Sequence, residues 1–471
     1  MLKHITTLCL VLALVAGSAF AGAHPGGIAR MLALGGSAYN PTNTGPNIIL
    51  NPFIHDDPTV MLLNPAYQNM YRDYAWMNIA GGAVNNFNSA ADNGYGFGKQ
   101  FAGVNFAFGK ELALGMNLSF DPSFANFVVT QLATFVNGVR GAGTAQTGLR
   151  PIDVFEAVAS YDLGSMDVGF AFTYGWATNT NTNSATPAPP TAVDNELSAR
   201  LLGFRAGIAM DLGGGMGFDA SAAIRMDKAT DNLKATLAGG TKGDRGDYSA
   251  SATEIQVDGR FHLKMSNKVN FVPYASFFTL SGEPKQDAPS TGATAITGSV
   301  KVNVTMLAVG AGMEYKINNF YFAGGVSFKS AKLKVEQNSG APANNSSTST
   351  TTMTSLPTFN LGMEWTLLDW LTGRMGYYRA FQNLNSKTEN SAPGVSSSSE
   401  SNAFGGTSNV IFGSYNGPDN SLITLGLGLK FGNFALDGTV SEEALRRGLG
   451  LIGATDNMNT FGYMTASYCF E

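Results

Sequence analysis

The sequence predicts an all-β fold, a transmembrane antiparallel β-barrel of about 14–16 strands with an N-terminal lumenal plug. Three observations predict this fold. The composition is apolar and poor in charge but has no segment suited to a transmembrane helix, apolar and polar residues alternate along the chain, and tight turns alternate with long loops.

The composition narrows the class of protein. Of 471 residues, 44% are hydrophobic and 13% are charged, whereas a soluble domain usually carries about 25% charged residues. The net charge of −5 offers no basic surface, so no nucleic-acid partner is expected. Beyond the N-terminus, no stretch reaches the roughly 18 consecutive apolar residues that a transmembrane helix needs. A closed β-barrel is the other structure that satisfies its backbone hydrogen bonds inside a membrane.

Residues 1–21 are predicted to be a secretory signal peptide. A basic start at Lys3, an apolar stretch over 8–16 and the small-x-small sequence ending at Ala21 fit such a leader, with cleavage after Ala23 as the alternative. After cleavage only Cys469 remains, so no internal disulfide can form. Export of a barrel predicts location in the cell outer membrane of a Gram-negative-type bacterium. The expected partners are outer-membrane lipid, lipopolysaccharide and the barrel assembly machinery.

Residues 22–72 do not alternate and are predicted to form the plug, or hatch. Asn64 suits a helix N-cap and Pro65 the first helical position, which predicts a short helix over about Pro65 to Tyr71. A segment of this length ahead of the first strand fits the lumen of a barrel. A loose periplasmic extension is the alternative.

Residues 73–471 are predicted to form the barrel, because their strands have one apolar and one charged face. Leu202 to Leu212, Met216 to Asp227 and Glu254 to Lys264 show this most clearly. Charges near the membrane midplane would cost roughly 2–4 kcal/mol each if they faced lipid, so they are expected to face the lumen. These predicted lumenal charges are Arg205, Asp219, Arg225, Asp227, Glu254, Asp258, Arg260, His262 and Lys264. Their mixed signs predict ion pairs that brace the plug or, alternatively, contact a substrate.

Turns set the predicted strand number. Tight turns are expected at 109–111, 163–165, 213–215, 266–268, 318–319, 368–370 and 432–433, and longer loops around 85–97, 121–151, 179–195, 229–248, 285–298, 337–352, 389–420 and 441–458. Short turns on one side and long loops on the other are typical of outer-membrane barrels. The turns predict about sixteen strands, an even number, and weak strands near either end would lower the number to about fourteen. Tyr468 and Phe470 share one face of the last strand, which is typical of barrels assembled in the outer membrane.

The loop after Asp121 is predicted to contain an amphipathic helix, because its apolar residues recur at helical spacing. The residues of this apolar face that are predicted to bind ligand are Phe124, Phe127, Val128, Leu132, Phe135 and Val136. An apolar surface of this size usually marks a binding site. Packing of the same face on the plug or on neighbouring loops is the alternative.

The N-terminal motif resembles a known family. Asp56-Asp57-Pro58-Thr59-Val60 followed by Asn64-Pro65-Ala66 is similar to the hatch of the FadL/TodX outer-membrane transporters, and the segments 361–365, 371–377 and 421–431 resemble their C-terminal hairpins. The resemblance implies fourteen strands, a hatch that contains Asn64, Pro65 and Ala66, and an extracellular loop that captures a hydrophobic ligand. The same plan resembles PorV-type proteins, which shuttle secreted proteins.

The expected function is therefore a channel for passive uptake of hydrophobic small molecules such as long-chain fatty acids or aromatic hydrocarbons. A general diffusion porin and a secretion shuttle or structural outer-membrane protein are the alternatives. No enzyme activity is expected, because the chain has no HExxH, GxSxG or P-loop motif. No cofactor or metal is expected either, because three consecutive residues such as His55-Asp56-Asp57 rarely converge on one ion and more often cap a turn.

Overall fold

The structure is a computed structural model that describes residues 26–38, 49–80, 100–121, 152–184, 192–236, 242–288, 299–338, 345–392, 395–404, 421–440 and 461–470. The predicted signal peptide and the predicted helix after Asp121 lie outside these residues. Within the described part of the chain, no helix combines the length and the apolar character needed to cross a membrane.

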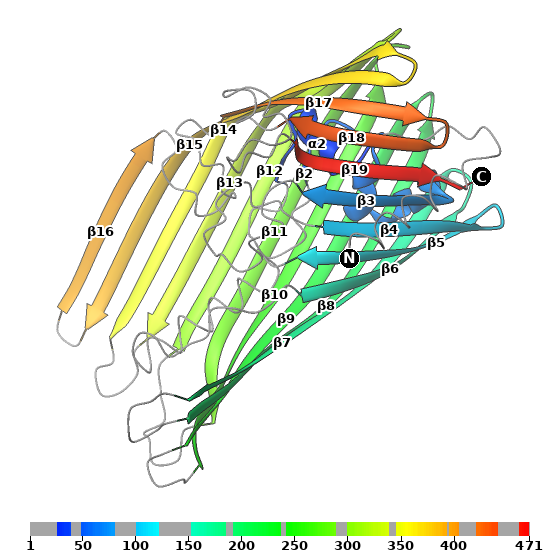
Figure 1. The fold of residues 1–471 in the computed structure, drawn as a ribbon. Coiled ribbons are helices and arrows are strands. Elements are labelled where there is room, and N and C mark those ends of the chain that lie inside the picture. The colour runs from blue at the N-terminus through cyan, green and yellow to red at the C-terminus, as the bar shows by residue number, and fades with distance from the viewer. Residues whose placement is uncertain are drawn as a thin grey trace, which may run out of the picture.

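The described strands close into an antiparallel barrel (Figure 1). Its strands are β3 (Tyr74–Ala80), β4 (Gln100–Phe108), β5 (Leu112–Asp121), β6 (Ile152–Asp162), β7 (Met166–Ser184), β8 (Ala192–Gly213), β9 (Met216–Thr236), β10 (Lys242–Lys264), β11 (Val269–Ala288), β12 (Ser299–Ile317), β13 (Phe320–Asn338), β14 (Ser346–Leu368), β15 (Leu371–Ala392), β16 (Val395–Phe404), β17 (Ser421–Phe431), β18 (Phe434–Val440) and β19 (Phe461–Cys469). The last strand, β19, pairs with the first, β3, which closes the ring. The described residues thus form a barrel of 16 strands with one extra strand.

The extra strand is β16. It pairs with the C-terminal half of β15, from Asn383 to Ala392. Strand β17 pairs with the N-terminal half of β15, from Leu371 to Arg379. Both strands run antiparallel to β15, so they extend the same side of it at different heights.

All of the predicted tight turns are confirmed, because each joins two neighbouring strands. Gly432 and Asn318 show why these sequences turn tightly, since their φ angles of 60° and 48° lie in the left-handed region that glycine and asparagine tolerate best.

Several of the predicted long loops are wrong in part. At the end away from the tight turns, β7 to β15 continue as strands into residues that were predicted to be loops. β14 has 23 residues, whereas a strand that only crosses the membrane needs about 9–11. The predicted loops 229–248, 337–352 and 389–420 therefore contain strand ends. In the 337–352 stretch, Thr350 pairs with Lys334 on one side and Lys387 on the other, and the β-branched threonines there favour a strand.

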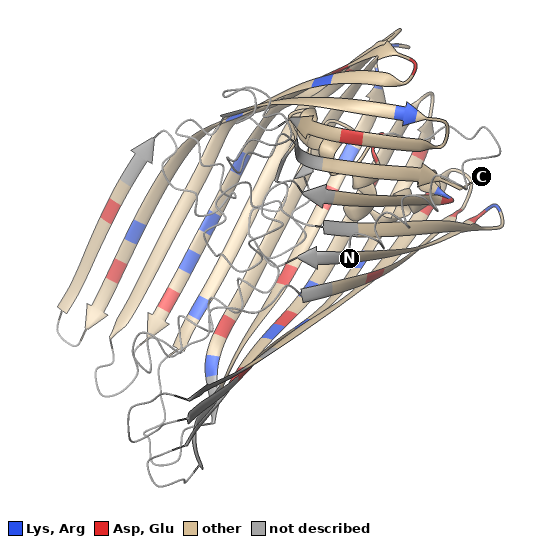
Figure 2. Cartoon of the chain, in the orientation of Figure 1, with Lys and Arg blue, Asp and Glu red and all other residues tan. Residues whose placement is uncertain are grey.

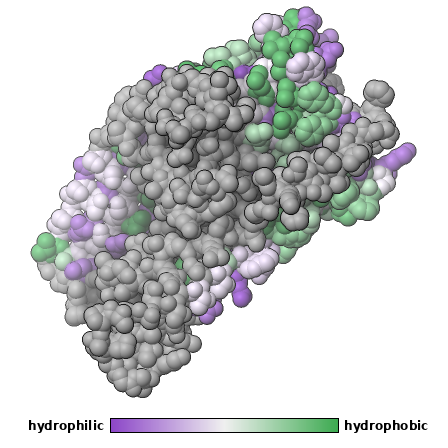
Figure 3. Space-filling view, in the orientation of Figure 1, coloured by the Kyte–Doolittle hydropathy of each residue, from purple (hydrophilic) through white to green (hydrophobic). Residues whose placement is uncertain are grey.

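The two faces of the barrel wall differ in character. Large apolar side chains are exposed on the outer face, among them Phe170 at 64% and Trp365 at 59% exposure. Figure 3 shows hydrophobic atoms over the half of the wall nearer the tight turns, whereas the far ends of β14–β16 are mostly hydrophilic. The opposite, inward face carries the buried residues of the same strands.

The N-terminal segment, defined here as residues 26–38 and 49–72, packs against this inward face. It contains α2 (Ile28–Ala33), the two-residue strands β1 (Ser37–Ala38) and β2 (Ile49–Leu50), and the 3₁₀ helices η1 (Pro58–Leu62) and η2 (Pro65–Tyr71). Helix α2 contacts β15 and β17–β19, whereas η2 contacts β4–β8. The main buried apolar cluster lies between this segment and the wall and includes Met31, Leu34, Ile54, Val60, Tyr67 and Tyr71.

Candidate functional site

Asn64-Pro65-Ala66 begins a helix as predicted, although the helix is of the 3₁₀ type. The Asn64 side chain accepts a hydrogen bond from the Ala66 amide at 3.0 Å, and Pro65 opens η2. The same Asn64 side chain donates to the carbonyl oxygens of Ile208 at 2.9 Å and Ala220 at 3.3 Å. One residue therefore caps η2 and fastens it to β8 and β9.

Glycines on the wall admit this motif at close range. A Cβ on Gly207 would collide with the Asn64 side chain, and a Cβ on Gly169 would collide with the backbone of Pro65 and Ala66. Only glycine lets two backbones approach this closely. The wall is thus shaped to the Asn64-Pro65-Ala66 turn.

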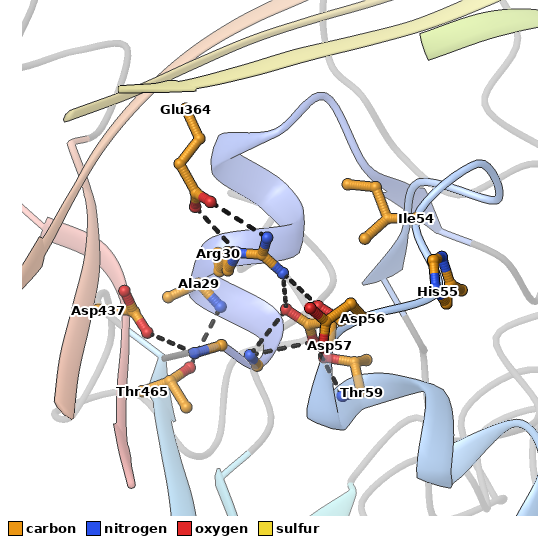
Figure 4. Close-up of polar contacts among 12 residues, drawn as sticks. Ala29, Arg30, Ile54, His55, Asp56, Asp57, Thr59, Glu364, Asp437 and Thr465 are labelled. Atoms are coloured by element: carbon orange, nitrogen blue, oxygen red, sulfur yellow. Dashed lines mark hydrogen bonds and ion pairs between the residues drawn. The ribbon is translucent and has the colours of Figure 1, made fainter. Parts of the chain in front are cut away.

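Arg30 is the centre of a buried ion network that sequence reasoning missed (Figure 4). Its guanidinium donates to Asp57 at 3.0 Å and to the Asp56 carbonyl oxygen at 2.8 Å. It also donates through two nitrogens to Glu364 of β14, at 2.9 and 3.2 Å. Paired contacts of this kind between arginine and carboxylate are among the strongest polar contacts in proteins. Arg30 therefore fixes both the fold of the N-terminal segment and its contact with the wall.

The network continues into the wall. Glu364 also accepts from Arg374, which in turn pairs with Asp437. Asp437 accepts from the Gly26 amide at 2.8 Å, so the chain of charges returns to the N-terminal segment. Glu364 and Arg374 were absent from the predicted lumenal charges, although both alternate with apolar neighbours in sequence, and that alternation is the one signal that could have placed them on the inward face.

Asp57 caps η1, as expected for a turn-capping residue. Its side chain accepts from the Thr59 amide at 2.8 Å and from the Gly27 amide at 3.1 Å. Burial raises the pKa of the Asp57 carboxyl, although Arg30 and Thr59 oppose this shift. Burial alone would lower the pKa of Arg30, but the carboxylates of Glu364 and Asp57 outweigh burial and raise it. Arg30 is therefore a permanent positive charge at the centre of the network.

The predicted lumenal charges lie almost entirely on the inward face. Figure 2 shows how charged residues are distributed along the strands. Asp219, Asp227, Glu254, Asp258, Arg260 and His262 are buried, and Arg205 and Arg225 are partly buried. Lys264 differs, because it is exposed next to the tight turn at the end of β10. At the end of a strand the side chain can reach solvent, so the alternation of apolar and polar residues no longer predicts whether it is buried.

These charges form ion pairs along the wall. Arg205 pairs with Glu156 of β6 at 2.8 Å, and Arg225 pairs with both Glu254 and Asp227. Glu156 was absent from the predicted set.

Two of the predicted charges, Arg260 and Asp219, contact the N-terminal segment. Arg260 pairs with Asp219 at 3.1 Å and donates to the Ile54 carbonyl oxygen at 2.9 Å. Tyr67 of η2 donates to Asp219 at 3.0 Å. Burial, reinforced by the Asp219 carboxylate, raises the pKa of Tyr67, so the phenol keeps its proton for this bond. The arrangement braces the segment against β9 and β10.

His55, His262 and Glu314 also meet at this point. They come from the N-terminal segment, β10 and β12, and the His55 and His262 rings lie 4.4 Å apart between centroids. His55 Nδ1 lies 2.8 Å from Glu314 Oε2. Burial lowers the pKa of His55, but the adjacent Glu314 outweighs burial and the net shift is upward. The sequence predicted no such meeting, because 207 residues separate the two histidines.

Farther from the tight turns, the inward face becomes apolar. A buried cluster of wall residues there consists of Phe278, Leu280, Val304, Met306, Ala331 and Met353. Each alternates with an outward neighbour; Phe277 and Leu307, for example, are exposed on the outer face. The inward face of β11–β14 is therefore apolar at this height, whereas the outer face is mixed and also carries Thr305, Lys332 and Thr352. We call these six residues the inward apolar cluster.

The predicted ligand-binding residues Phe124, Phe127, Val128, Leu132, Phe135 and Val136 lie outside the described residues, so their role stays a prediction.

Comparisons with known proteins give structural neighbours only. No protein-family model matches the chain, and no curated protein matches it in sequence. The monoaromatic hydrocarbon channel CymD is 12% identical with a TM-score of 0.32, and covers 75% of this chain and 97% of its own. The toluene transporter TodX of Pseudomonas putida is 9% identical with a TM-score of 0.34, and covers 95% and 97%. The ferric-catecholate import receptor Fiu of E. coli is 9% identical with a TM-score of 0.33, and covers 84% and 81%.

These neighbours are channels, transporters and receptors. Since the scores are low and the neighbours carry different cargo, no cargo follows from the likeness. The structural neighbours of this chain thus include hydrocarbon channels such as TodX, whose family the N-terminal motif resembles.

Proposed function

We propose that this protein is an outer-membrane channel through which hydrophobic small molecules pass by passive diffusion. The observation that carries this proposal is the inward apolar cluster. A general diffusion porin would keep this face polar, because water fills its lumen. A lipophilic solute instead gains about 25 cal/mol for each Å² of apolar surface that it removes from water.

The exposed apolar residues of the outer face support a membrane location. Exposure to water would be unfavourable for the large apolar side chains of Phe170, Phe204 and Trp365. A transmembrane barrel presents an apolar band of this kind to lipid. Such a barrel is an outer-membrane structure, and the lipopolysaccharide outside it resists passage of lipophiles.

The N-terminal segment is proposed to be the plug of this channel, and residues 22–72 to be its extent. The Arg30 network ties α2 to β14, and Tyr67 ties η2 to β9. Contacts with wall strands at such different positions in the ring fit a segment inside the lumen.

The experiment is uptake of a labelled long-chain fatty acid or aromatic hydrocarbon by cells that lack their own channels for these compounds. Replacing Phe278 and Met306 by serine should lower uptake at least tenfold, because each apolar side chain is worth about 1.5–3 kcal/mol of burial. Val335→Ser is the control. Val335 lies on the same face of β13 as Ala331, four residues along the strand, but is outside the cluster. Unchanged uptake in a correctly folded double variant would contradict the proposal.

The apolar helix predicted after Asp121 is proposed to capture the ligand first. Phe127→Ser together with Leu132→Ser should weaken uptake while heat-modifiable migration on a gel shows an intact barrel, because loops tolerate change better than strands. If the helix packs on the plug instead, the same variant should admit small antibiotics. Uptake and antibiotic entry that both stay unchanged would exclude both roles.

A further inference from the structure

His55, His262 and Glu314 bring three metal-binding side chains together. One ligand atom from each lies within 4.8 Å of the other two. The three residues come from the N-terminal segment, β10 and β12, so only the folded chain assembles them. His262 and Glu314 are buried, and the His55 side chain is 31% exposed.

The hydrogen bonding of His262 is that of a metal ligand. Its Nε2 lies 3.0 Å from Asp219 Oδ2, while its Nδ1 is buried and has no hydrogen-bond partner among the residues that the structure describes. When Nε2–H donates its hydrogen bond to the Asp219 carboxylate, Nδ1 carries the lone pair that a metal ion would need. Metal-binding histidines almost always use one ring nitrogen for the metal and donate the other to a carboxylate or carbonyl oxygen. No hydrogen bond among the described residues satisfies the buried Nδ1, whereas a metal ion would.

Glu314 is held in place from several sides. Tyr321 donates to its Oε1 at 2.8 Å, and Asn270 donates to its Oε2 at 3.4 Å. His55 Nδ1 approaches Oε2 to 2.8 Å but lacks the alignment of a hydrogen bond. The backbone amide of His55 also donates to Oε1 of Glu314 at 3.4 Å, so the carboxylate is fixed with the His55 ring beside it.

The geometry points to a site for one divalent transition-metal ion, bound by His55, His262 and Glu314. Imidazole and carboxylate together suit zinc and related ions, and two histidines with one glutamate form a known zinc ligand set that leaves a fourth position open. Bond lengths of about 2.0–2.1 Å in a tetrahedron place the ligand atoms about 3.4 Å apart. The partly exposed His55 ring can close the difference by rotating.

The surrounding charges permit a cation. Asp219 and Glu314 face the site with negative charge, and Asp56 is adjacent in sequence to His55. Arg260 is the opposing positive charge, but it is paired with Asp219. A bound ion would join residue 55 to β10 and β12, and so would fasten the N-terminal segment to the wall.

The test is isothermal titration of Zn²⁺ into the detergent-purified, chelator-stripped protein, prepared without a histidine tag. One equivalent should bind. His55→Gln, His262→Gln and Glu314→Gln should each weaken binding at least tenfold, and Asp219→Asn about 10–100-fold through loss of orientation. His24→Gln and Glu336→Gln are the controls, since His24 is the other histidine after the predicted leader and Glu336 is a partly exposed acid on β13 that pairs with Lys334. Both controls should bind as the parent does.

A second readout identifies the ligands. Electron paramagnetic resonance of bound Cu²⁺ should show coupling to two imidazole nitrogens, reduced to one in His55→Gln. That variant changes no strand residue, so it keeps the test valid if the barrel variants fail to fold. The inference is overturned if the folded parent binds no Zn²⁺. Binding that survives all three ligand substitutions, or that is lost in His24→Gln, also overturns it.

Discussion

Replacing Arg30 by methionine should release the N-terminal segment from the barrel without unfolding the barrel. Methionine keeps much of the side-chain volume but leaves the buried Asp57 and Glu364 without their shared partner. Removing one member of a buried ion pair costs about 3–5 kcal/mol. Glu364 keeps Arg374, and Asp57 keeps the amides of Gly27 and Thr59, so the lower end of this range applies. About 3 kcal/mol corresponds to roughly a 100-fold larger undocked population.

Amide hydrogen exchange measures this population directly. Amides bonded within the segment, such as those of Met31 and Val60, should exchange roughly 100-fold faster in Arg30→Met, whereas amides of β12 should be unchanged. Arg72→Gln is the control, because Arg72 contacts Asn69 and lies outside the Arg30 network, and changes away from buried networks stay within about 0.5 kcal/mol. Equal exchange in Arg30→Met and the parent would refute the role assigned to the network.

Two further substitutions test the close packing and the membrane face. Gly207→Val should displace Asn64 from the wall and expose residues 49–72 to protease. Gly259→Val is the control and should not do so, because an added Cβ there meets only an ordinary contact. Identical digestion patterns of the two variants would contradict the packing. Phe170 is the fifth residue of β7, so it lies near the middle of a membrane crossing of about 9–11 residues that begins at the tight turn, as proposed. Phe170→Arg should therefore destabilise the barrel by about 2–4 kcal/mol in urea titrations in lipid vesicles, and Leu163→Arg in the tight turn by about 0–1 kcal/mol. Equal costs at the two depths would show that the outer face does not contact lipid.

The parts of the fold predicted correctly were those set by local chemistry. The tight turns follow from residues that tolerate left-handed backbone, such as Gly432 and Asn318. The inward position of Asp219 and Arg260 follows from the two-residue period of a strand. The start of η2 follows from Asn64 and Pro65, because a cap needs only its nearest neighbours.

The parts that were missed depend on contacts between residues far apart in sequence, or on strand lengths that the amino-acid composition does not indicate. Arg30 meets Glu364 across 334 positions, and nothing near either residue indicates the other. The short helix α2 and the wall partner Glu156 were missed for the same reason. The Ser/Thr-rich stretch 346–352 resembles a loop in composition, yet it gains its hydrogen bonds from β13 and β15.

Mass spectrometry of the natively extracted protein tests the central claim most directly, because a channel with an inward apolar cluster should retain its cargo. The account predicts a copurifying lipophile of defined mass in the parent protein, strongly reduced when Phe278 and Met306 are both serine and retained in Val335→Ser. A folded parent protein that carries no lipophile, or one whose bound lipophile is unaffected by the double substitution, would contradict it.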